Sequence, residues 1–298
     1  MKVKVIDMHM VKSKSILSPK NGMNLYRGCT HGCIYCDSRS RCYQMQHDFE
    51  DIEVKSNAIE LLEDTLKRKR KPCMISTGAM TDSYIPLEIR LQHTRQCLQI
   101  IERYGFGVAI LTKSSRILRD LDILKRINEK TKCVVQMTLT TSDESLCGLI
   151  EPNVSTTKER FEVLKIMRDN GIPTIVWLSP ILPFINDTVE NINGILDYCE
   201  KAEVKGVICF GMGLTLREGN REYFYHALDK KFPGLKERYI NTFGNAYEIK
   251  SKNSRELMEL FHKRCKKNGI VYDINTIFTY LHTFEQKNLP EQMSIFDL

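Results

Sequence analysis

The chain of 298 residues carries 44 Lys and Arg against 37 Asp and Glu, a formal net charge of +7, and it contains 11 cysteines. This surplus suits an anionic partner but is too small to establish nucleic-acid binding. No apolar run approaches the roughly 18 residues of a membrane span, so we expect none. The N-terminus has no apolar signal core, and a chain with many cysteines and no secretory signal is typical of a reducing compartment. We therefore expect the protein in the cytoplasm.

Residues 1–23 are polar and lack clear periodicity, so we interpret them as a leader segment that covers part of the core. A short strand is expected over residues 24–28, where it would end at a glycine-containing loop. This loop carries three cysteines in a C-x3-C-x2-C pattern, and they are Cys29, Cys33 and Cys36.

Three thiolates in so short a loop indicate a metal site, because soft sulfur ligands suit zinc, copper(I) or an iron–sulfur cluster. Structural zinc usually takes four protein ligands in paired motifs, and no second such pair occurs in the sequence. A ferredoxin cluster takes four cysteines. Three thiolates on a four-iron cluster would leave one iron open to a substrate or cofactor. The alternative is three buried structural cysteines.

The spacing, with the aromatic Tyr35 directly before the last cysteine, resembles the radical S-adenosylmethionine (radical SAM) superfamily. The resemblance implies that Cys29, Cys33 and Cys36 hold a 4Fe–4S cluster whose open iron binds SAM. It also implies an external low-potential electron donor and reductive cleavage of SAM to a 5′-deoxyadenosyl radical. Because the family uses three ligands, Cys42 is expected not to be a fourth.

Apolar runs and helical patterns alternate through the rest of the chain. Strands are expected to begin near Cys73, Gly107, Cys133, Thr174 and Lys205. Amphipathic helices are expected over 55–71, 87–104, 115–129, 157–170 and 188–202. Capping boxes support the last two helix starts, and they pair Thr156 with Glu159 and Asp187 with Glu190.

This alternation predicts parallel strands joined by right-handed crossovers, and therefore an α/β fold. Together with the strand before the cysteine loop it makes six βα units, fewer than the eight of a closed TIM barrel. We therefore predict a partial (β/α)6 barrel of TIM type over residues 24–213, the fold that the resemblance also implies. A doubly wound sheet is the alternative.

In such folds the chemistry collects at the carboxyl ends of the strands. Here those ends carry hydroxyl groups, a lysine and glycines: Thr77, Lys113, Thr138, Thr140, Ser179 and residues 211–213. We expect SAM to lie across this rim, with Thr77 among its contacts. The alternative is that Ser and Thr end strands merely as turn formers.

Residues 81–88, 111–114, 151–160 and 179–187 resemble the spore photoproduct lyase-related branch of the radical SAM proteins. Carried over position by position, the resemblance implies SAM contacts for Thr81, Lys113 and Thr138, and a radical-relay role for Tyr35.

Two positions depart from the lyase pattern. Ala79 stands where the lyase has its hydrogen-donating cysteine, and Asp37 stands where it has a second tyrosine. A different substrate is therefore expected. Cys147 and Cys209 are the alternative thiol donors, although each is better explained as a small buried apolar side chain. Glu151 and Arg160 are expected near the rim, in a structural or a substrate-positioning role.

Residues 214–285 break the alternation and form a C-terminal extension, with one helix expected over 253–268. Their interleaved aromatic and basic residues would either stack on single-stranded nucleic acid or pack as helices over the barrel. Residues 286–298 are expected to be a flexible tail. Within it, Gln292–Phe296 resembles the peptide by which bacterial replication and repair proteins bind the sliding clamp.

These patterns predict a radical SAM enzyme with an unassigned substrate, for which nucleic acid is a candidate. The alternative is a non-catalytic iron–sulfur accessory or sensor protein at the DNA replication and repair machinery. An electron carrier of ferredoxin type is disfavoured by the missing fourth ligand.

Overall fold

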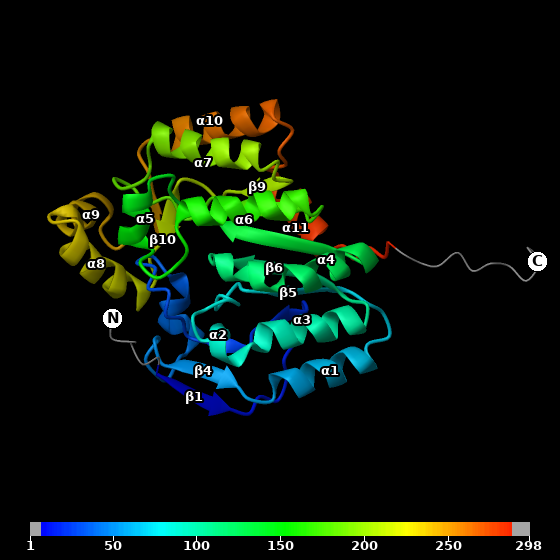
Figure 1. Ribbon diagram of the computed structural model, residues 1–298. Coiled ribbons are helices and arrows are strands. Elements are labelled where there is room, and N and C mark those ends of the chain that lie inside the picture. Colours follow the sequence, from blue (N-terminus) through cyan, green and yellow to red (C-terminus); the bar gives the residue numbers. More distant parts are fainter. Residues whose placement is uncertain (1–6, 288–298) are drawn as a thin grey trace, which may run out of the picture.

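The computed structural model describes residues 7–287, and a six-stranded sheet forms its centre (Figure 1). The strands are β2 (Gly22–Met23), β5 (Met74–Thr77), β6 (Gly107–Thr112), β7 (Cys133–Thr138), β8 (Thr174–Trp177) and β9 (Gly206–Ile208). They pair in parallel in the order β2-β5-β6-β7-β8-β9. A doubly wound sheet reverses its order at a switch point. The order here runs in one direction only, which confirms the partial barrel.

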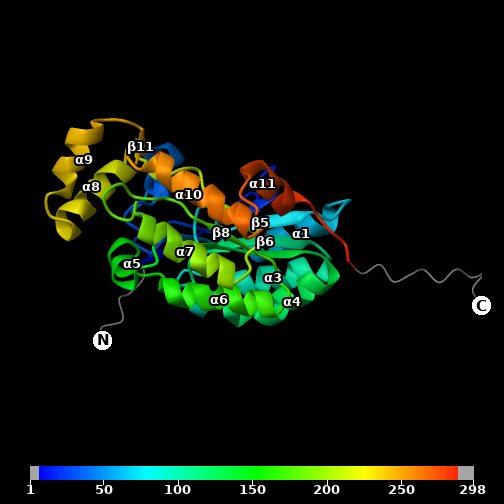
Figure 2. The ribbon, with the colours of Figure 1, turned by 90° about the horizontal axis from the view of Figure 1, so that it is seen from above.

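Helices follow the strands and cover the convex face of the sheet. They are α1 (Ala58–Arg68), α2 (Glu88–Leu91), α3 (His93–Arg103), α4 (Leu121–Lys130), α5 (Glu144–Ile150), α6 (Thr157–Asp169) and α7 (Val189–Lys201). Figures 1 and 2 show α3, α4 and α6 along one side of the sheet. Their apolar sides, such as Leu98 and Leu124, share one buried cluster with strand residues such as Val108 and Val135.

Three predicted helices differ in detail from the structure. The helix expected over 87–104 is interrupted at Gln92, whose φ of 52° lies in the left-handed region. The helix expected over 115–129 begins with a 3-10 turn, Ser115–Asp120. The Thr156 capping box is confirmed. The Asp187 box is wrong, because Thr188 caps α7 while the Asp187 carboxylate accepts from the Ser251 hydroxyl.

The concave face of the sheet is closed by α11 (Ile274–His282), which lies across the sheet from α3 and α4 in Figure 2. Ile277 and Leu281 of this helix pack against strand residues whose side chains face the barrel interior, including Ala109, Val134 and Ile208. The interior is therefore filled on this side by the C-terminal part of the chain.

The strand expected over 24–28 is wrong in position. The first barrel strand is β2, and Tyr26–Arg27 (β3) belongs to a separate small sheet with β1 (Met8–Val11) and β4 (Ile52–Lys55), in the order β1-β4-β3. The predicted leader, residues 1–23, thus supplies β1 to the small sheet and β2 to the six-stranded sheet. Because β4 ends at Lys55, the helix expected over 55–71 begins later, at Ala58.

The C-terminal region adds a two-stranded antiparallel sheet and three helices. They are β10 (Gly213–Thr215), β11 (Glu248–Lys250), α8 (Asn220–Lys231), α9 (Leu235–Phe243) and α10 (Ser254–Lys267). α10 lies beside α7, and α8 and α9 lie together at one end of the molecule (Figures 1 and 2). Phe224 and Tyr239 are fully buried in a core shared with Ile34 and Tyr35 of the cysteine loop. These aromatic side chains therefore pack rather than form an open stacking surface.

The clamp-binding prediction for Gln292–Phe296 lies outside the described residues. Among the described helices, none has the length and apolar character that crossing a membrane requires.

Candidate cluster and cofactor site

A cavity of about 650 Å³ opens at the carboxyl ends of the parallel strands. One wall is the cysteine loop, with Cys29, Cys33 and Cys36. A second wall is formed by residues that end or follow the strands, and the C-terminal sheet β10–β11 supplies the third. The predicted collection of chemical groups at this end of the barrel is therefore present.

The cysteine loop is held by its own backbone. Gly28 has a φ of +92°, and a Cβ there would lie 2.6 Å from the carbonyl oxygen of Phe49, so a side chain is excluded. The Cys29 N–H donates to that same oxygen at 2.9 Å. The His31 N–H donates to Cys29 Sγ at 3.5 Å, an interaction that stabilises negative charge on the sulfur. Backbone contacts thus determine the shape of the loop.

The thiols of this loop are buried among apolar groups. Burial raises the pKa of Cys29 to about 12 and that of Cys33 well above its usual value. A thiol that coordinates a metal is deprotonated by the metal's charge. These side chains therefore need a bound cation in order to act as thiolates.

The spacing of the sulfur atoms tests what kind of metal fits. Among the described residues, no group of three potential ligands that includes these cysteines has its ligand atoms within 4.8 Å of one another. A single zinc ion at about 2.3 Å from each sulfur would bring the sulfurs to roughly 3.8 Å apart. The cysteines do not form such a compact group, and their all-sulfur ligand set suits an iron–sulfur cluster.

Lys113 follows β6 and lines the cavity beside the cysteines. Burial by itself lowers the pKa of Lys113, but the negative charges of Cys33 in its thiolate form and of the Glu151 carboxylate outweigh it, so the pKa lies above its usual value. The ammonium group is therefore charged. Asp82 fixes this turn, because its carboxylate accepts from the Lys113 N–H and from the Thr112 hydroxyl, each at 2.7 Å.

His31 also lines the cavity and is 2 % exposed. Burial lowers the pKa of His31, which keeps the imidazole neutral near pH 7. Its Nε2 atom is buried and has no hydrogen-bond partner among the described residues. An unpaired buried polar atom is costly, so a ligand that bonds to it would gain affinity.

A buried network ties the cysteine loop to the end of β7. The Tyr35 hydroxyl donates to Glu151, and Arg160 donates to the other Glu151 oxygen at 2.6 Å. Arg160 also donates to the backbone oxygen of Thr138 at 2.7 Å and to Cys147 Sγ at 3.0 Å. Burial alone would raise the pKa of Glu151, but Arg160 and Lys113 hold it below its usual range. Glu151 and Arg160 therefore form a charged pair.

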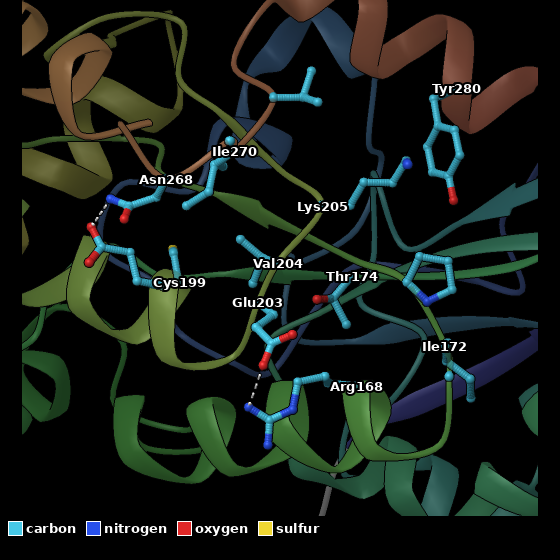
Figure 3. A pocket seen from close by; sticks show the side chains of 15 residues that line it. Arg168, Ile172, Thr174, Cys199, Glu203, Val204, Lys205, Asn268, Ile270 and Tyr280 are labelled. Atoms are coloured by element: carbon cyan, nitrogen blue, oxygen red, sulfur yellow. Dashed lines mark hydrogen bonds and ion pairs between the residues drawn. The ribbon is translucent and has the colours of Figure 1, made fainter. Parts of the chain in front are cut away.

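A second cavity, of about 730 Å³, lies near the amino ends of β8 and β9, among α6, α7 and α10 (Figure 3). Its polar groups contact one another: Arg168 lies 3.7 Å from Glu203, and the Asn268 amide donates to Glu200 at 2.7 Å. It lies far from the cysteine loop in the fold and brings together no comparable set of reactive groups. The cysteine-lined cavity is therefore the candidate site.

The sequence matches the family model described as the radical SAM superfamily over residues 23–199. The chain belongs to the radical SAM superfamily. The cofactors of this family are a 4Fe–4S cluster and SAM. The matched segment includes the cysteine loop and the barrel strands β5 to β8.

Several proteins are similar to this chain in sequence. An uncharacterized protein of Methanocaldococcus jannaschii is 32 % identical over 197 residues, which is 63 % of this chain and 73 % of that one. An uncharacterized protein of Mycobacterium tuberculosis is 27 % identical over 238 residues, 78 % of this chain and 69 % of its own. The radical SAM Nα-GlyT isomerase of Pseudomonas phage M6 is 23 % identical over 53 % of this chain and 32 % of its own.

Solved structures of spore photoproduct lyase share the radical SAM fold of this chain. The complex with dinucleoside spore photoproduct superposes with a TM-score of 0.61 at 12 % identity, covering 88 % of this chain and 79 % of the lyase. A variant with bound AdoMet and the same dinucleoside gives 0.62 at 13 % identity over the same shares.

The residues predicted to serve the cofactor, which are four SAM contacts and the relay residue Tyr35, separate into two groups. Tyr35, Lys113 and Thr138 line the cavity together with the three cysteines. Thr77 and Thr81 are buried and are absent from its lining. The Thr77 hydroxyl instead pairs with the Ser83 hydroxyl at 2.9 Å. The structure thus brings Tyr35 together with two of the four predicted SAM contacts, Lys113 and Thr138.

The two positions that depart from the lyase pattern, Asp37 and Ala79, both lie in the cavity wall. Cys147 and Cys209 are buried and do not line it; Cys209 Sγ instead lies 3.8 Å from Met258 Sδ. The exposed Cys42 is also outside the lining. Among the described residues, the cysteines of the wall are those of the radical SAM motif alone.

Sequence reasoning missed an aromatic part of the wall. Trp177 ends β8 and Phe210 follows β9, and their ring centroids lie 5.9 Å apart. Phe210 is 59 % exposed although it is apolar. Tyr43 also enters the wall, and its hydroxyl donates to Asp37 at 3.0 Å. The position of Trp177, the only tryptophan of the chain, at a predicted strand end was the available signal.

Proposed function

We propose that this chain is a radical SAM enzyme that holds a 4Fe–4S cluster through Cys29, Cys33 and Cys36 and cleaves SAM reductively. When bound, this pair would supply a 5′-deoxyadenosyl radical for hydrogen abstraction from a substrate in the cavity. The observation that carries this proposal is that all three thiols border a cavity of about 650 Å³ rather than a closed core. That volume is typical of ligand sites, which span roughly 300–1,000 Å³.

When bound, the cluster and SAM supply the radical chemistry, and the protein contributes binding, orientation and exclusion of water. Lys113 offers a charged donor for the SAM carboxylate, and the Thr138 hydroxyl offers a neutral polar contact. Glu151 holds the Tyr35 hydroxyl in place. Among the described residues, the wall carries no thiol beyond the proposed ligands, so the proposed reaction uses no cysteine hydrogen donor from this part of the chain.

Nucleic acid is the substrate class that we propose. The lyase that shares the fold has been solved with a dinucleoside spore photoproduct. In this chain the net charge of +7 suits a polyanion. Trp177 and Phe210 form an aromatic part of the cavity wall on which a planar base can stack. Ala79 and Asp37 in the wall support a substrate other than that of the lyase.

The function is tested with anaerobically reconstituted protein, reduced in the presence of SAM and either DNA or tRNA. We expect 5′-deoxyadenosine by mass spectrometry, with the yield increased by the nucleic acid that is the substrate. If no nucleoside forms and SAM leaves the EPR spectrum of the reduced cluster unchanged, the enzyme proposal fails. That result would favour the non-catalytic accessory or sensor protein.

Replacing Lys113 with methionine is expected to weaken SAM binding about 10- to 150-fold, because a hydrogen bond to a charged group contributes about 1.5–3 kcal/mol. The affinity is measured by equilibrium binding of SAM to cluster-loaded protein. Lys125→Met, which changes an exposed lysine on α4, is the control and should bind SAM normally. An unchanged affinity in Lys113→Met with a normal cluster spectrum would exclude the assigned contact.

A further inference from the structure

A second set of metal-ligating side chains lies outside the cavity, on the small sheet formed by β1, β4 and β3. His9 comes from β1, Glu53 from β4 and His47 from the segment that precedes β4. One ligand atom of each lies within 4.8 Å of those of the other two. β1 and β4 pair in parallel with His9 directly opposite Glu53, so the strand register itself places these two side chains together.

Each histidine has its Nδ1 atom engaged by an acceptor. His9 Nδ1 lies 2.9 Å from an Asp51 carboxylate oxygen, and His47 Nδ1 lies 3.0 Å from the backbone oxygen of Asp48. Because both partners are acceptors, Nδ1 carries the hydrogen in the neutral ring, which leaves the lone pair on Nε2. Metal-binding histidines are oriented by this kind of contact to a carboxylate or a carbonyl.

His47 Nε2 itself is buried and has no hydrogen-bond partner among the described residues. It lies 3.6 Å from a Glu53 carboxylate oxygen, which is too long for a hydrogen bond. A tetrahedral zinc ion with its ligands at about 2.0–2.2 Å separates two ligand atoms by roughly 3.4 Å. The observed separation therefore fits two ligands of one ion better than a direct contact.

We propose that His9, His47 and Glu53 bind a divalent transition-metal ion, and that Zn²⁺ is the ion they suit best. Asp51 acts as a positioning residue for His9. The side chain of His9 is 38 % exposed and that of Glu53 is 19 % exposed, so solvent can supply the remaining ligand. This site contains no sulfur, which separates it chemically from the cysteine loop.

The bound ion would stabilise the segment against which the cysteine loop is hydrogen-bonded. His47 and Asp51 belong to the segment whose Phe49 oxygen accepts the Cys29 N–H at 2.9 Å. An ion held by β1, β4 and this segment would add a cross-link to three parts of the chain that already pack together through the strand pairing and apolar side chains such as Ile52 and Phe49. We therefore expect it to act on stability rather than on the chemistry of the cavity.

The test uses full-length, cluster-loaded protein dialysed against buffered Zn²⁺, with bound zinc measured by mass spectrometry. We expect one zinc per chain in addition to the iron. Its X-ray absorption spectrum should show only nitrogen and oxygen ligands near about 2.0–2.1 Å, without the sulfur distance of about 2.3 Å that cysteine would give. Zn²⁺ should also raise the melting temperature, since binding to the folded state stabilises it.

His47→Ala and Glu53→Gln are expected to lose this zinc and its effect on the melting temperature. Asp51→Asn should weaken zinc binding by about 10- to 100-fold, the usual effect of removing a group that orients a ligand. His226→Ala, an exposed histidine on α8, is the matched control and should bind zinc like the unaltered protein. Circular dichroism and iron content verify that each variant is folded.

Equal zinc content in the unaltered protein and in His47→Ala would overturn the proposal. Sulfur in the zinc coordination shell would overturn it as well, because the ion would then occupy cysteines. Neither outcome depends on SAM cleavage, so the zinc site and the proposed function stand or fall separately.

Discussion

Cys33→Ala is expected to abolish both the visible iron–sulfur absorbance of the reconstituted protein and the formation of 5′-deoxyadenosine. Three cysteines line the cavity, and in the proposed site their thiolates would hold the cluster. Removing one thiolate leaves two, which is too few to keep the cluster in place while one iron stays open to SAM. The measurements are the absorption spectrum, the iron content and mass spectrometry of the nucleoside.

The matched control for this variant is Cys42→Ala. Cys42 is exposed and lies outside the cavity lining, although it is only six residues beyond Cys36. This variant should keep its cluster and its activity. A loss of the cluster in Cys42→Ala that equals the loss in Cys33→Ala would mean that the ligands are assigned wrongly.

Arg160→Leu is expected to lower the free energy of unfolding by about 3–5 kcal/mol, the usual cost of leaving a buried charge without its partner. Arg160 and Glu151 both have side chains that are 0 % exposed, and their contact is 2.6 Å. The variant leaves the Glu151 carboxylate buried with the Tyr35 hydroxyl and the more distant Cys147 thiol as side-chain donors. Denaturant unfolding of the purified protein measures the change.

Two further variants serve as controls for this result. The double variant Glu151→Leu with Arg160→Leu should be more stable than Arg160→Leu alone, because it removes the unpaired charge. Arg255→Leu alters a side chain that is 93 % exposed and should cost less than about 1 kcal/mol. If Arg160→Leu is no less stable than Arg255→Leu, the buried pair does not hold the cysteine loop to the barrel.

The barrel could be predicted from sequence because its strands are apolar runs separated by amphipathic helices. The position predicted for the first barrel strand is wrong because β2 has only two residues, too few to show the apolar–polar alternation of a strand. The small sheet was missed for a related reason. Its strands Met8–Val11 and Ile52–Lys55 are short and lie far apart in the sequence, so only the folded chain brings them into register.

The site could be predicted where the sequence spacing itself defines the chemistry, as in the cysteine loop, and at strand ends such as Lys113 and Thr138. The site could not be predicted where the direction of a side chain decides whether the residue lines the cavity. Thr77 also ends a strand, yet its hydroxyl turns to Ser83. Arg160 has the sequence appearance of an ordinary charged helix residue, and its burial becomes intelligible only beside Glu151.

The cavity is built from parts of the chain that leave the ribosome at different times. The cysteine loop ends at Cys36, whereas the sheet that forms the opposite wall begins at Gly213, 177 positions later. At about 5–20 residues per second, synthesis of that interval takes roughly 9–35 seconds. During this time β10 and β11 have not yet been synthesised and cannot cover the cysteines. Delivery of iron and sulfide during translation would therefore meet an open loop, whereas delivery to the finished protein must pass through the cavity mouth.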